Sequence, residues 1–299
     1  MFALAAAMST AATDTLFKGI FSGMPPMAMA ALRFFAPLPL LLPMLFVSPV
    51  PHLHPQFWMI VACLVPLEVM AMTLYMKALK VSEMSLSIPM LAFSPSFIVI
   101  TGWLILGETV NLRGLAGIMT TVFGAYVLHM RATGTKGGLL APFKSLATNK
   151  GARYMVMVAI LYSMTSCLGK RAIQLSSPVF FAPFYFSLLG ITFPFFYLIY
   201  SKETAMGYVK GIVHAKIIPK DVLFALVATG VLQAVMIYSH MIAISLANVA
   251  YMITVKRTSL LFNIVFGAVF LGERPIAPRL LGGGLMLFGV FLVMTTQGM

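Results

Sequence analysis

The chain has 299 residues, of which 61% are hydrophobic and 9% are charged, and its formal net charge is +13. About a quarter of the residues in an ordinary soluble domain are charged, so a water-soluble fold of this composition has no way to bury its apolar side chains. A helix that crosses the hydrocarbon core of a bilayer needs roughly 20 apolar residues, and stretches of that length recur along the chain. The composition therefore predicts an all-α integral membrane protein that crosses the lipid bilayer several times.

The basic residues that produce the net charge lie mainly between the apolar stretches. In a soluble protein this charge favours nucleic acid as a partner, whereas in a membrane protein the Lys and Arg residues of the connecting loops set the topology. We therefore expect no nucleic-acid partner. Cys63 and Cys167 lie within apolar stretches, without the spacing of a metal site or a disulfide framework. The sequence predicts no metal site and no cofactor.

Apolar runs that end at Gly, Pro or charged residues predict ten spanning helices. The first five occupy residues 4–22, 25–47, 57–79, 84–106 and 112–130, and the second five occupy residues 154–173, 179–200, 220–245, 248–271 and 277–296. A basic segment separates the two sets. We therefore divide the chain into a first five-helix repeat (1–130), a linker (131–153) and a second five-helix repeat (154–299).

The two sets of helices are related by internal repetition. A shift of 165 positions aligns the Leu-Gly-Glu triplets at 106–108 and 271–273 without a gap, and a shift of 152 positions pairs Lys18 with Lys170. A five-helix unit followed by its own copy enters the membrane from the opposite side, so the repeats are expected to be inverted. The basic loops favour termini outside the cytoplasm under the positive-inside rule.

Ten short helices in a five-plus-five duplication, with Leu-Gly-Glu ending the fourth and the ninth, resemble the EamA-type members of the drug/metabolite transporter superfamily. The resemblance covers almost the whole chain and implies a carrier for a small polar metabolite in a prokaryotic plasma (inner) membrane. The superfamily includes amino-acid exporters, nucleotide-sugar transporters and plastid triose-phosphate/phosphate translocators, so its fold does not name a substrate. Family descriptions often put both termini in the cytoplasm, which leaves the orientation open. We expect a monomer or a homodimer.

Lys256 and Arg257 lie about eight residues into the predicted ninth span, roughly 12 Å along a helix. The pair is similar to a Lys-Arg pair in the ninth helix of the triose-phosphate/phosphate translocators, which binds the substrate phosphate. The resemblance implies that Lys256 and Arg257 bind an anionic group, a role that suits a point charge beside a planar guanidinium. The alternative is an internal ion pair with Glu68. The translocators' other phosphate-binding residues have no match here.

A polar stripe is predicted on two other helices. The shift of 165 positions pairs Glu68 with Gln233 and Tyr75 with His240, and in each helix the two residues are two turns apart on one face. Both stripes are expected to line one substrate cavity. Glu68 has two open roles, as a proton-coupling carboxyl or as a fixed counter-ion to a buried arginine. His240 is interpreted either as a packing residue or as a proton relay.

Three further charged residues lie within predicted spans. Asp14 and Lys18 are four residues apart on the first helix, which lets them neutralise each other within one turn. Arg33 in the second helix has two open roles, as an anchor for Asp14 or as an extension of the cationic cavity. Tyr251 in the ninth span completes the expected substrate-binding set.

Glycines in the fifth and tenth helices are predicted to be packing surfaces, because small residues let membrane helices approach closely. They are Gly117, Gly124, Gly282, Gly283 and Gly284. We expect no ligand role for them.

Motifs that would indicate an enzyme or an ATP-driven pump are absent from the sequence. There is no Gly-x-x-x-x-Gly-Lys-Ser/Thr, His-Glu-x-x-His or Gly-x-Ser-x-Gly motif. The main hypothesis is a secondary transporter that moves a small polar anion, bearing phosphate or carboxylate, by alternating access. Two alternatives remain: an amino-acid or amine exporter, in which Glu68 receives the substrate ammonium, and a flippase for a lipid-linked substrate.

Overall fold

The computed structural model describes residues 1–21, 23–81, 88–132, 149–200, 219–272 and 280–296, and these are helical apart from short connections. In the first half the helices are α1 (Phe2–Ile20), α2 (Pro26–Phe35), α3 (Leu38–Val47), α4 (Pro55–Val81), the 3-10 helix η1 (Ile88–Phe93), α6 (Ser94–Leu106) and α7 (Leu112–Ala132). In the second half they are α9 (Lys150–Gln174), α10 (Pro178–Tyr200), α12 (Pro219–Leu246), α13 (Val249–Lys256), α14 (Ser259–Leu271) and α15 (Leu280–Thr296). Each predicted span contains one of these helices or a broken pair.

Several of the described helices are long and apolar enough to cross a membrane. Five qualify outright: Pro55–Ala78, Lys150–Gln174, Pro178–Ile199, Val222–Leu246 and Val249–Leu271. A sixth span is the bent pair Met27–Phe35 and Leu38–Val47, and shorter apolar helices cover Met90–Leu106, Leu112–Leu128 and Leu281–Thr296. The predicted class, an all-α integral membrane protein, agrees with this architecture.

In two of the predicted spans the helix is broken within the bundle. The bend of 43° between α2 and α3 falls at Pro37, which has no N–H to continue the helical ladder. The break between α13 and α14 contains no proline. There Leu260 N donates to the Arg257 carbonyl at 3.0 Å and Leu261 N donates to the Thr258 carbonyl at 2.9 Å, which tightens the backbone locally. The break places Lys256 and Arg257 at the end of one short helix and before the next.

The duplication is visible in the bounds of two helices. α6 and α14 begin and end at positions that differ by the same 165 residues as the sequence repeat. Each ends at a glycine in the left-handed region, Gly107 with φ 69° and Gly272 with φ 67°. Residues with a side chain rarely adopt this backbone conformation, so the glycine of Leu-Gly-Glu ends both helices in the same way. Glu273, the last residue of the second triplet, lies outside the described residues.

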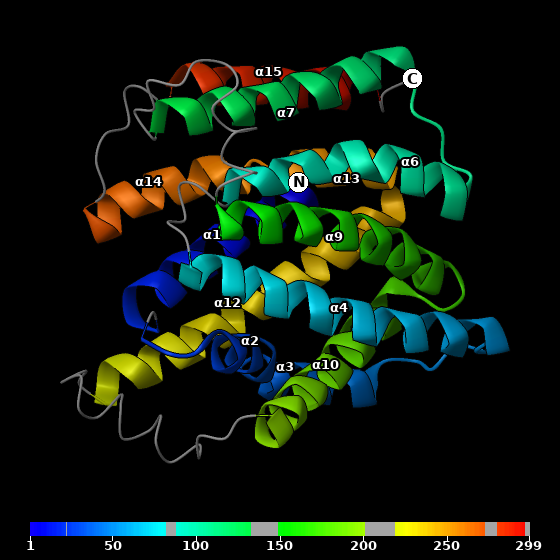
Figure 1. Ribbon diagram of the computed structural model, residues 1–299. Helices are drawn as coiled ribbons and strands as arrows, with labels where there is room; N and C mark the ends of the chain where they lie inside the picture. The colour runs from blue at the N-terminus through cyan, green and yellow to red at the C-terminus, as the bar shows by residue number, and fades with distance from the viewer. Residues whose placement is uncertain (22, 82–87, 133–148, 201–218, 273–279, 297–299) are drawn as a thin grey trace.

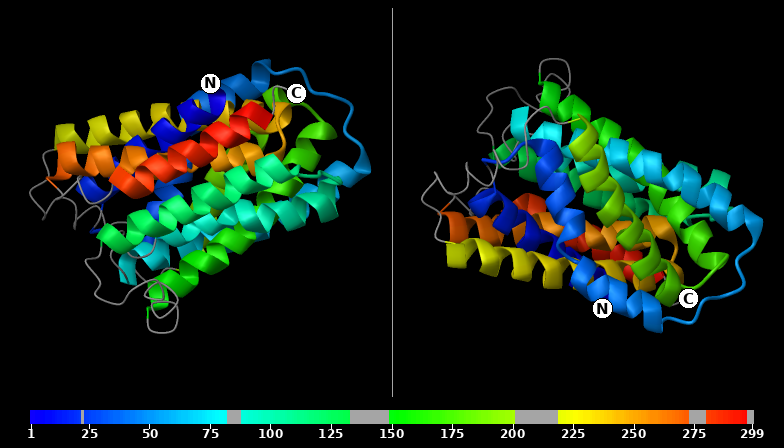
Figure 2. Two further views of the ribbon diagram at one scale, coloured as in Figure 1. Left: turned by 90° about the horizontal axis from the view of Figure 1, so that it is seen from above. Right: turned by 90° about the horizontal axis from the view of Figure 1, so that it is seen from below.

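The two halves interleave in the bundle. In Figure 1, α7 and α15 lie side by side along one edge, while α2, α3 and α10 form the opposite edge. Between them α4 packs on α9, and α1 packs on α12 and α14, so each of these contacts joins one half to the other. Figure 2 shows that the long helices run in roughly one common direction. The centre of the bundle is therefore formed by helices of both halves.

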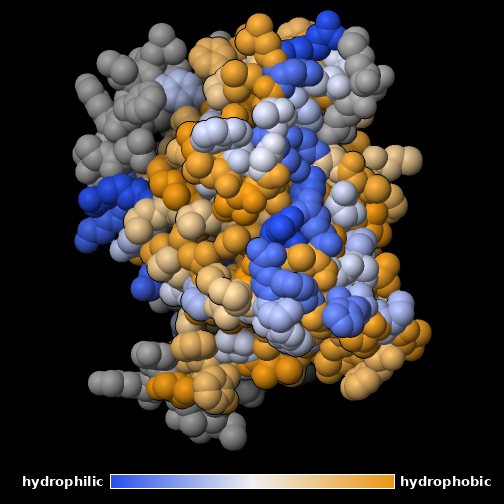
Figure 3. Space-filling model, turned by 90° about the vertical axis from the view of Figure 1, so that its right-hand side faces the viewer, coloured by the Kyte–Doolittle hydropathy of each residue, from blue (hydrophilic) through white to orange (hydrophobic). Residues whose placement is uncertain are grey.

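The outer surface is largely apolar. Large side chains such as Leu104, Phe224 and Phe291 are 60% or more exposed, which suits contact with lipid. Figure 3 looks at the end of the bundle where the α6–α7 and α12–α13 connections lie, and there a band of hydrophilic side chains runs between hydrophobic ones.

α7 and α15 make the closest backbone approach that the glycine pattern predicts. A Cβ atom built on Gly117 would lie 2.8 Å from the Gly289 carbonyl oxygen, and one on Gly282 would overlap the backbone of Leu128. Gly284 differs, because a Cβ there meets nothing within 4 Å. The three-glycine run thus contains one residue that the helix contact requires and one that it does not.

We therefore expect Gly282→Ala to lower the free energy of unfolding by about 1 to 3 kcal/mol, the usual effect of overpacking. Gly284→Ala is the matched control, with an expected change within about 0.5 kcal/mol. Thermal unfolding of the detergent-solubilised protein measures both variants. Equal destabilisation by the two substitutions would contradict the packing described for α7 and α15.

Candidate functional site

A cavity of about 170 Å³ lies among the central helices and is lined by residues of both halves. Eight of the ten residues that the sequence predicts for the site line it: Asp14, Arg33, Glu68, Tyr75, Gln233, His240, Lys256 and Arg257. Tyr251 and Lys18 do not. Residues from α1, α2, α4, α12 and α13, far apart in the sequence, are thus brought to one place.

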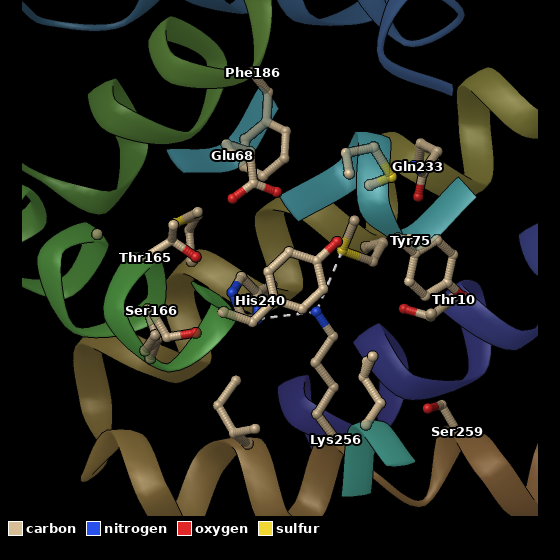
Figure 4. Close-up of a pocket in the computed structure, with 18 of the residues that line it drawn as sticks. Thr10, Glu68, Tyr75, Thr165, Ser166, Phe186, Gln233, His240, Lys256 and Ser259 are labelled. Atoms are coloured by element: carbon tan, nitrogen blue, oxygen red, sulfur yellow. Dashed lines mark hydrogen bonds between the residues drawn. The ribbon is translucent and has the colours of Figure 1, made fainter. Parts of the chain in front are cut away.

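The Lys256 ammonium group reaches into this cavity from the end of α13. Its Nζ lies 3.3 Å from His240 Nδ1 and 3.8 Å from Met236 Sδ (Figure 4). Both partners are on α12 and neither is a carboxylate. Among the described residues, no carboxylate oxygen lies within 4.0 Å of this ammonium.

Arg257 follows directly, and its guanidinium bonds across the halves. Its Nε donates to Ser94 Oγ at 3.0 Å, and its Nη2 donates to the same oxygen. Ser94 is the first residue of α6 and corresponds to Ser259, the first residue of α14, under the 165-residue shift. Arg257 therefore has a neutral hydroxyl partner, and like Lys256 it has no carboxylate within 4.0 Å in the described part of the chain.

The start of α14 also borders the cavity. Ser259, Leu260 and Asn263, all in its first turns, line the cavity. The first N–H groups of α14 are already bonded, because Leu260 N donates to the Arg257 carbonyl and Leu261 N donates to the Thr258 carbonyl. The two cations and the polar residues Ser259 and Asn263 thus line the same cavity.

Glu68 and Gln233 lie at the opposite side of the cavity from Lys256 (Figure 4). Thr165 of α9 lies beside the Glu68 carboxylate, and Glu68 forms no ion pair with Lys256 or Arg257 within 4.0 Å. Gln233 is 2% exposed, and its Oε1 has no hydrogen-bond partner within the described residues. An acceptor is therefore available for a bound molecule at this side.

Asp14 pairs with Arg33. Asp14 Oδ1 and Arg33 Nη1 are 2.6 Å apart, with both side chains under 10% exposed, and the guanidinium lies 5.9 Å from the centre of the Phe17 ring. The ion pair agrees with the first role predicted for Arg33, an anchor for Asp14, and Arg33 also lines the cavity. The pair that the sequence suggested for Asp14 was Lys18, one turn away on the same helix. Lys18 lies outside the cavity lining.

Tyr251 points away from the cavity. Its hydroxyl accepts from Asn111 N at 3.2 Å and donates to Asn111 Oδ1 at 3.4 Å, and its ring covers Gly114 of α7. Five residues of helix rotate a side chain by about 140°, so Tyr251 and Lys256 occupy different faces of α13. The position of a residue within the ninth span therefore does not decide whether its side chain lines the cavity.

Sequence reasoning missed the contribution of α9. Tyr162, Thr165, Ser166 and Gly169 all line the cavity. Their spacing of three, four and seven residues marks one face of a helix. That pattern of small and hydroxyl-bearing residues was the available signal.

The described helices form a bundle of membrane-length helices around a charged cavity, the architecture of a multi-pass membrane protein. The model of the EamA-like transporter family matches residues 1–130 and 149–295. The chain therefore belongs to the EamA-like transporter family, as its Leu-Gly-Glu repeat predicted. It is a transporter of small molecules and not an enzyme.

One solved crystal structure shows the same fold over nearly the whole length. It covers 98% of this chain and 98% of its own, with a TM-score of 0.73 and 15% sequence identity. At that identity the likeness is one of fold alone. No curated protein matches the sequence.

The buried pair gives a testable stability relation. Removing one partner leaves an uncompensated charge, so Asp14→Asn or Arg33→Gln alone should cost about 3 to 5 kcal/mol. The double variant removes both charges and is expected to be more stable than either single variant. Thermal unfolding in detergent measures the cycle. A double variant whose loss equals the sum of the single losses would show that the two groups do not interact.

Proposed function

We propose that the protein is a secondary carrier for a small anionic metabolite, one that bears a phosphate or a carboxylate. Lys256 and Arg257 would hold the anionic group, and Glu68, Gln233, Tyr75 and His240 would line the rest of the cavity. One observation carries the proposal: two adjacent cations line a cavity and bond only to neutral groups. A charge held away from water without a counter-charge is costly, and a bound anion supplies that counter-charge.

The charges around the cavity support an anion over a cation. Arg33 and Asp14 neutralise each other in their ion pair. Lys256, Arg257 and Glu68 then leave one excess positive charge when all three are ionised. A substrate with a negative group balances this excess, whereas an amine without an acid group increases it.

The cavity volume supports a small substrate. An engineered protein cavity of about 150 Å³ accepts a molecule the size of benzene. The 170 Å³ here therefore suits a short carboxylate or a small phosphate ester better than a nucleotide or a sugar nucleotide.

For the transport cycle we propose alternating access between two inverted repeats, 1–130 and 154–299, with ten spans in all. The matching bounds of α6 and α14 support the duplication, and the breaks beside the cavity suit movement of helix segments. Since the sequence has no phosphate-binding loop, the energy would come from an ion gradient or from exchange.

A second candidate is an amino-acid exporter. Glu68 lies in the same cavity as Lys256 and Arg257 without pairing to either. A zwitterion would then place its carboxylate on the cations and its ammonium on Glu68. This alternative differs from the main proposal in what Glu68 contacts.

The main proposal predicts that Lys256→Ala with Arg257→Ala abolishes anion binding. Hydrogen bonds to charged groups contribute about 1.5 to 3 kcal/mol each, so the double change should weaken binding at least about 100-fold. Phosphorylated metabolites, dicarboxylates and amino acids are first screened for thermal stabilisation of the detergent-solubilised protein. The matched control is Lys150→Ala with Arg171→Ala, two basic residues that do not line the cavity. Unaltered anion binding in folded double-variant protein would make the assignment wrong.

The two candidates predict opposite effects of Glu68→Gln. For an anion that contacts only the cations, loss of a negative charge in the cavity should tighten binding about three- to tenfold, an interaction on the order of 1 kcal/mol. Gln233→Glu, at the equivalent position of the other repeat, should weaken it by a similar factor. Titration of the stabilising compound from the screen measures both. Loss of binding in Glu68→Gln would instead assign Glu68 to a substrate ammonium and favour the amino-acid exporter.

A further inference from the structure

A second ion pair lies at the end of the cavity and joins the two halves. Lys170 Nζ donates to Glu108 Oε1 at 2.5 Å and to the Ala247 carbonyl at 2.6 Å. Glu108 Oε2 accepts from Val249 N, the first N–H of α13, at 2.9 Å. Glu108 comes from the first half, and Lys170, Ala247 and Val249 come from the second.

The Leu-Gly-Glu motif explains how Glu108 reaches this position. Gly107 takes the left-handed conformation after α6, and Glu108 N donates back to the Gly102 carbonyl at 3.1 Å. The left-handed glycine and this backbone bond end the helix and fix the residue after the glycine. The glycine therefore directs the carboxylate toward α9 and α13.

The pair lies immediately beyond the cavity lining. Gly169 lines the cavity, and Lys170 is its neighbour. On α12 the lining residue Ile244 comes one turn before Ala247, and on α13 the lining residue Ile253 comes one turn after Val249. The three helices thus converge on Glu108 at this end of the cavity.

Two further bonds join the same segments. Asn248 Nδ2 donates to the Thr109 carbonyl at 3.4 Å, and Asn111 N donates to the Tyr251 hydroxyl at 3.2 Å. The α6–α7 connection therefore lies against the α12–α13 turn. Tyr251 acts in this contact and not in the cavity.

We infer that Glu108 and Lys170 form a reversible lock that closes this end of the cavity. The bonds of the lock connect the two halves, so the halves separate at this end only when these bonds break. The Lys170 and Glu108 side chains are 10% and 18% exposed, which leaves water close enough to replace the bonds when the end opens. The lock is thus a contact that forms in one conformation and breaks in the other.

The helix α13 connects the lock to the proposed anion site. This helix has eight residues, with its first N–H held by Glu108 and its last residue, Lys256, in the cavity. A helix of that length spans about 12 Å, so the contact with Glu108 and the cation lie about 12 Å apart on one segment. Release of Glu108 therefore frees the segment that carries the cation.

The inference rests on the proposed carrier but not on its substrate, and its test requires no substrate. The full chain carries Cys63→Ala and Cys167→Ser, with Ser166→Cys in the cavity as the single reporter, and is reconstituted in liposomes. A membrane-impermeant, positively charged methanethiosulfonate reagent is added from either side. His52→Cys in the same background, exposed on the α3–α4 connection at the same end, identifies the side that carries the lock (Figure 1).

We expect Glu108→Gln and Lys170→Met each to raise the rate of modification of the reporter from the lock side about tenfold or more, because the open state becomes more populated. Arg171→Met is the matched control. It removes the same charge from the next residue of α9, whose guanidinium bonds to Gln174 of its own helix. The modification rate in this control should stay within about twofold of the rate in the protein with the intact lock, since a surface substitution usually changes energies by no more than about 0.5 kcal/mol.

Unchanged rates in the Glu108→Gln and Lys170→Met proteins would overturn the lock. Lower thermal stability with an unchanged rate would also overturn it, since the pair would then be a structural contact only. Glu108→Asp covers the case in which the neutral variants do not fold. It keeps the charge and retracts the carboxylate by one methylene, so an intermediate rate is expected and an unaltered rate contradicts the lock. Loss of anion binding in the Lys256, Arg257 variant bears on the proposed substrate and leaves this result unaffected.

Discussion

A charge inside a membrane protein needs a partner, because neither lipid nor apolar side chains replace the water it loses. Two ion pairs among the described residues satisfy this rule. Asp14 neutralises Arg33 between two helices of the first half, and Glu108 neutralises Lys170 between the halves. Lys256 and Arg257 lack such a partner among the described residues and bond to a histidine, a methionine and a serine. Glu68 also has no ion pair within 4.0 Å in the described part of the chain, so these uncompensated charges all lie in one cavity, with a net excess of positive charge when ionised. A bound anion has most to contribute beside Lys256 and Arg257.

Much of the fold and part of the site follow from the sequence, for physical reasons. Span length and duplication can be predicted because they are local or periodic properties of the sequence. The bounds of α6 and α14 agree with the predicted spans and with the 165-residue shift. Depth within a span identified eight cavity-lining residues. Contacts between helices do not follow from spacing. Asp14 pairs with Arg33 of a neighbouring helix because packing brings that guanidinium within 2.6 Å. Tyr251 was assigned to the cavity from its place in the ninth span alone, without regard to the rotation of its side chain around the helix.

The duplicated scaffold carries an asymmetric charge. Under the 165-residue shift, Lys256 and Arg257 correspond to Leu91 and Ala92 of η1, which are uncharged. Arg257 nevertheless reaches the first half, because it donates to Ser94 at the start of α6. Its guanidinium therefore bonds across the two halves of the chain, from the cationic site to the first-half helix α6. In the proposed transport cycle, related repeats suit exchange between two conformations, while the asymmetric charge suits recognition of one kind of substrate.

The energies of the anion site and the lock are of matching size. A bound ligand shifts a conformational equilibrium only by the difference between its affinities for the two states. A partly exposed ion pair with its added hydrogen bonds contributes a few kcal/mol at most, and hydrogen bonds to charged groups contribute about 1.5 to 3 kcal/mol each. An anion that contacts Lys256 and Arg257 in one state better than in the other therefore supplies enough free energy to open or close a lock of the kind proposed for Glu108. α13 is the element that connects the two, since it joins both contacts within eight residues.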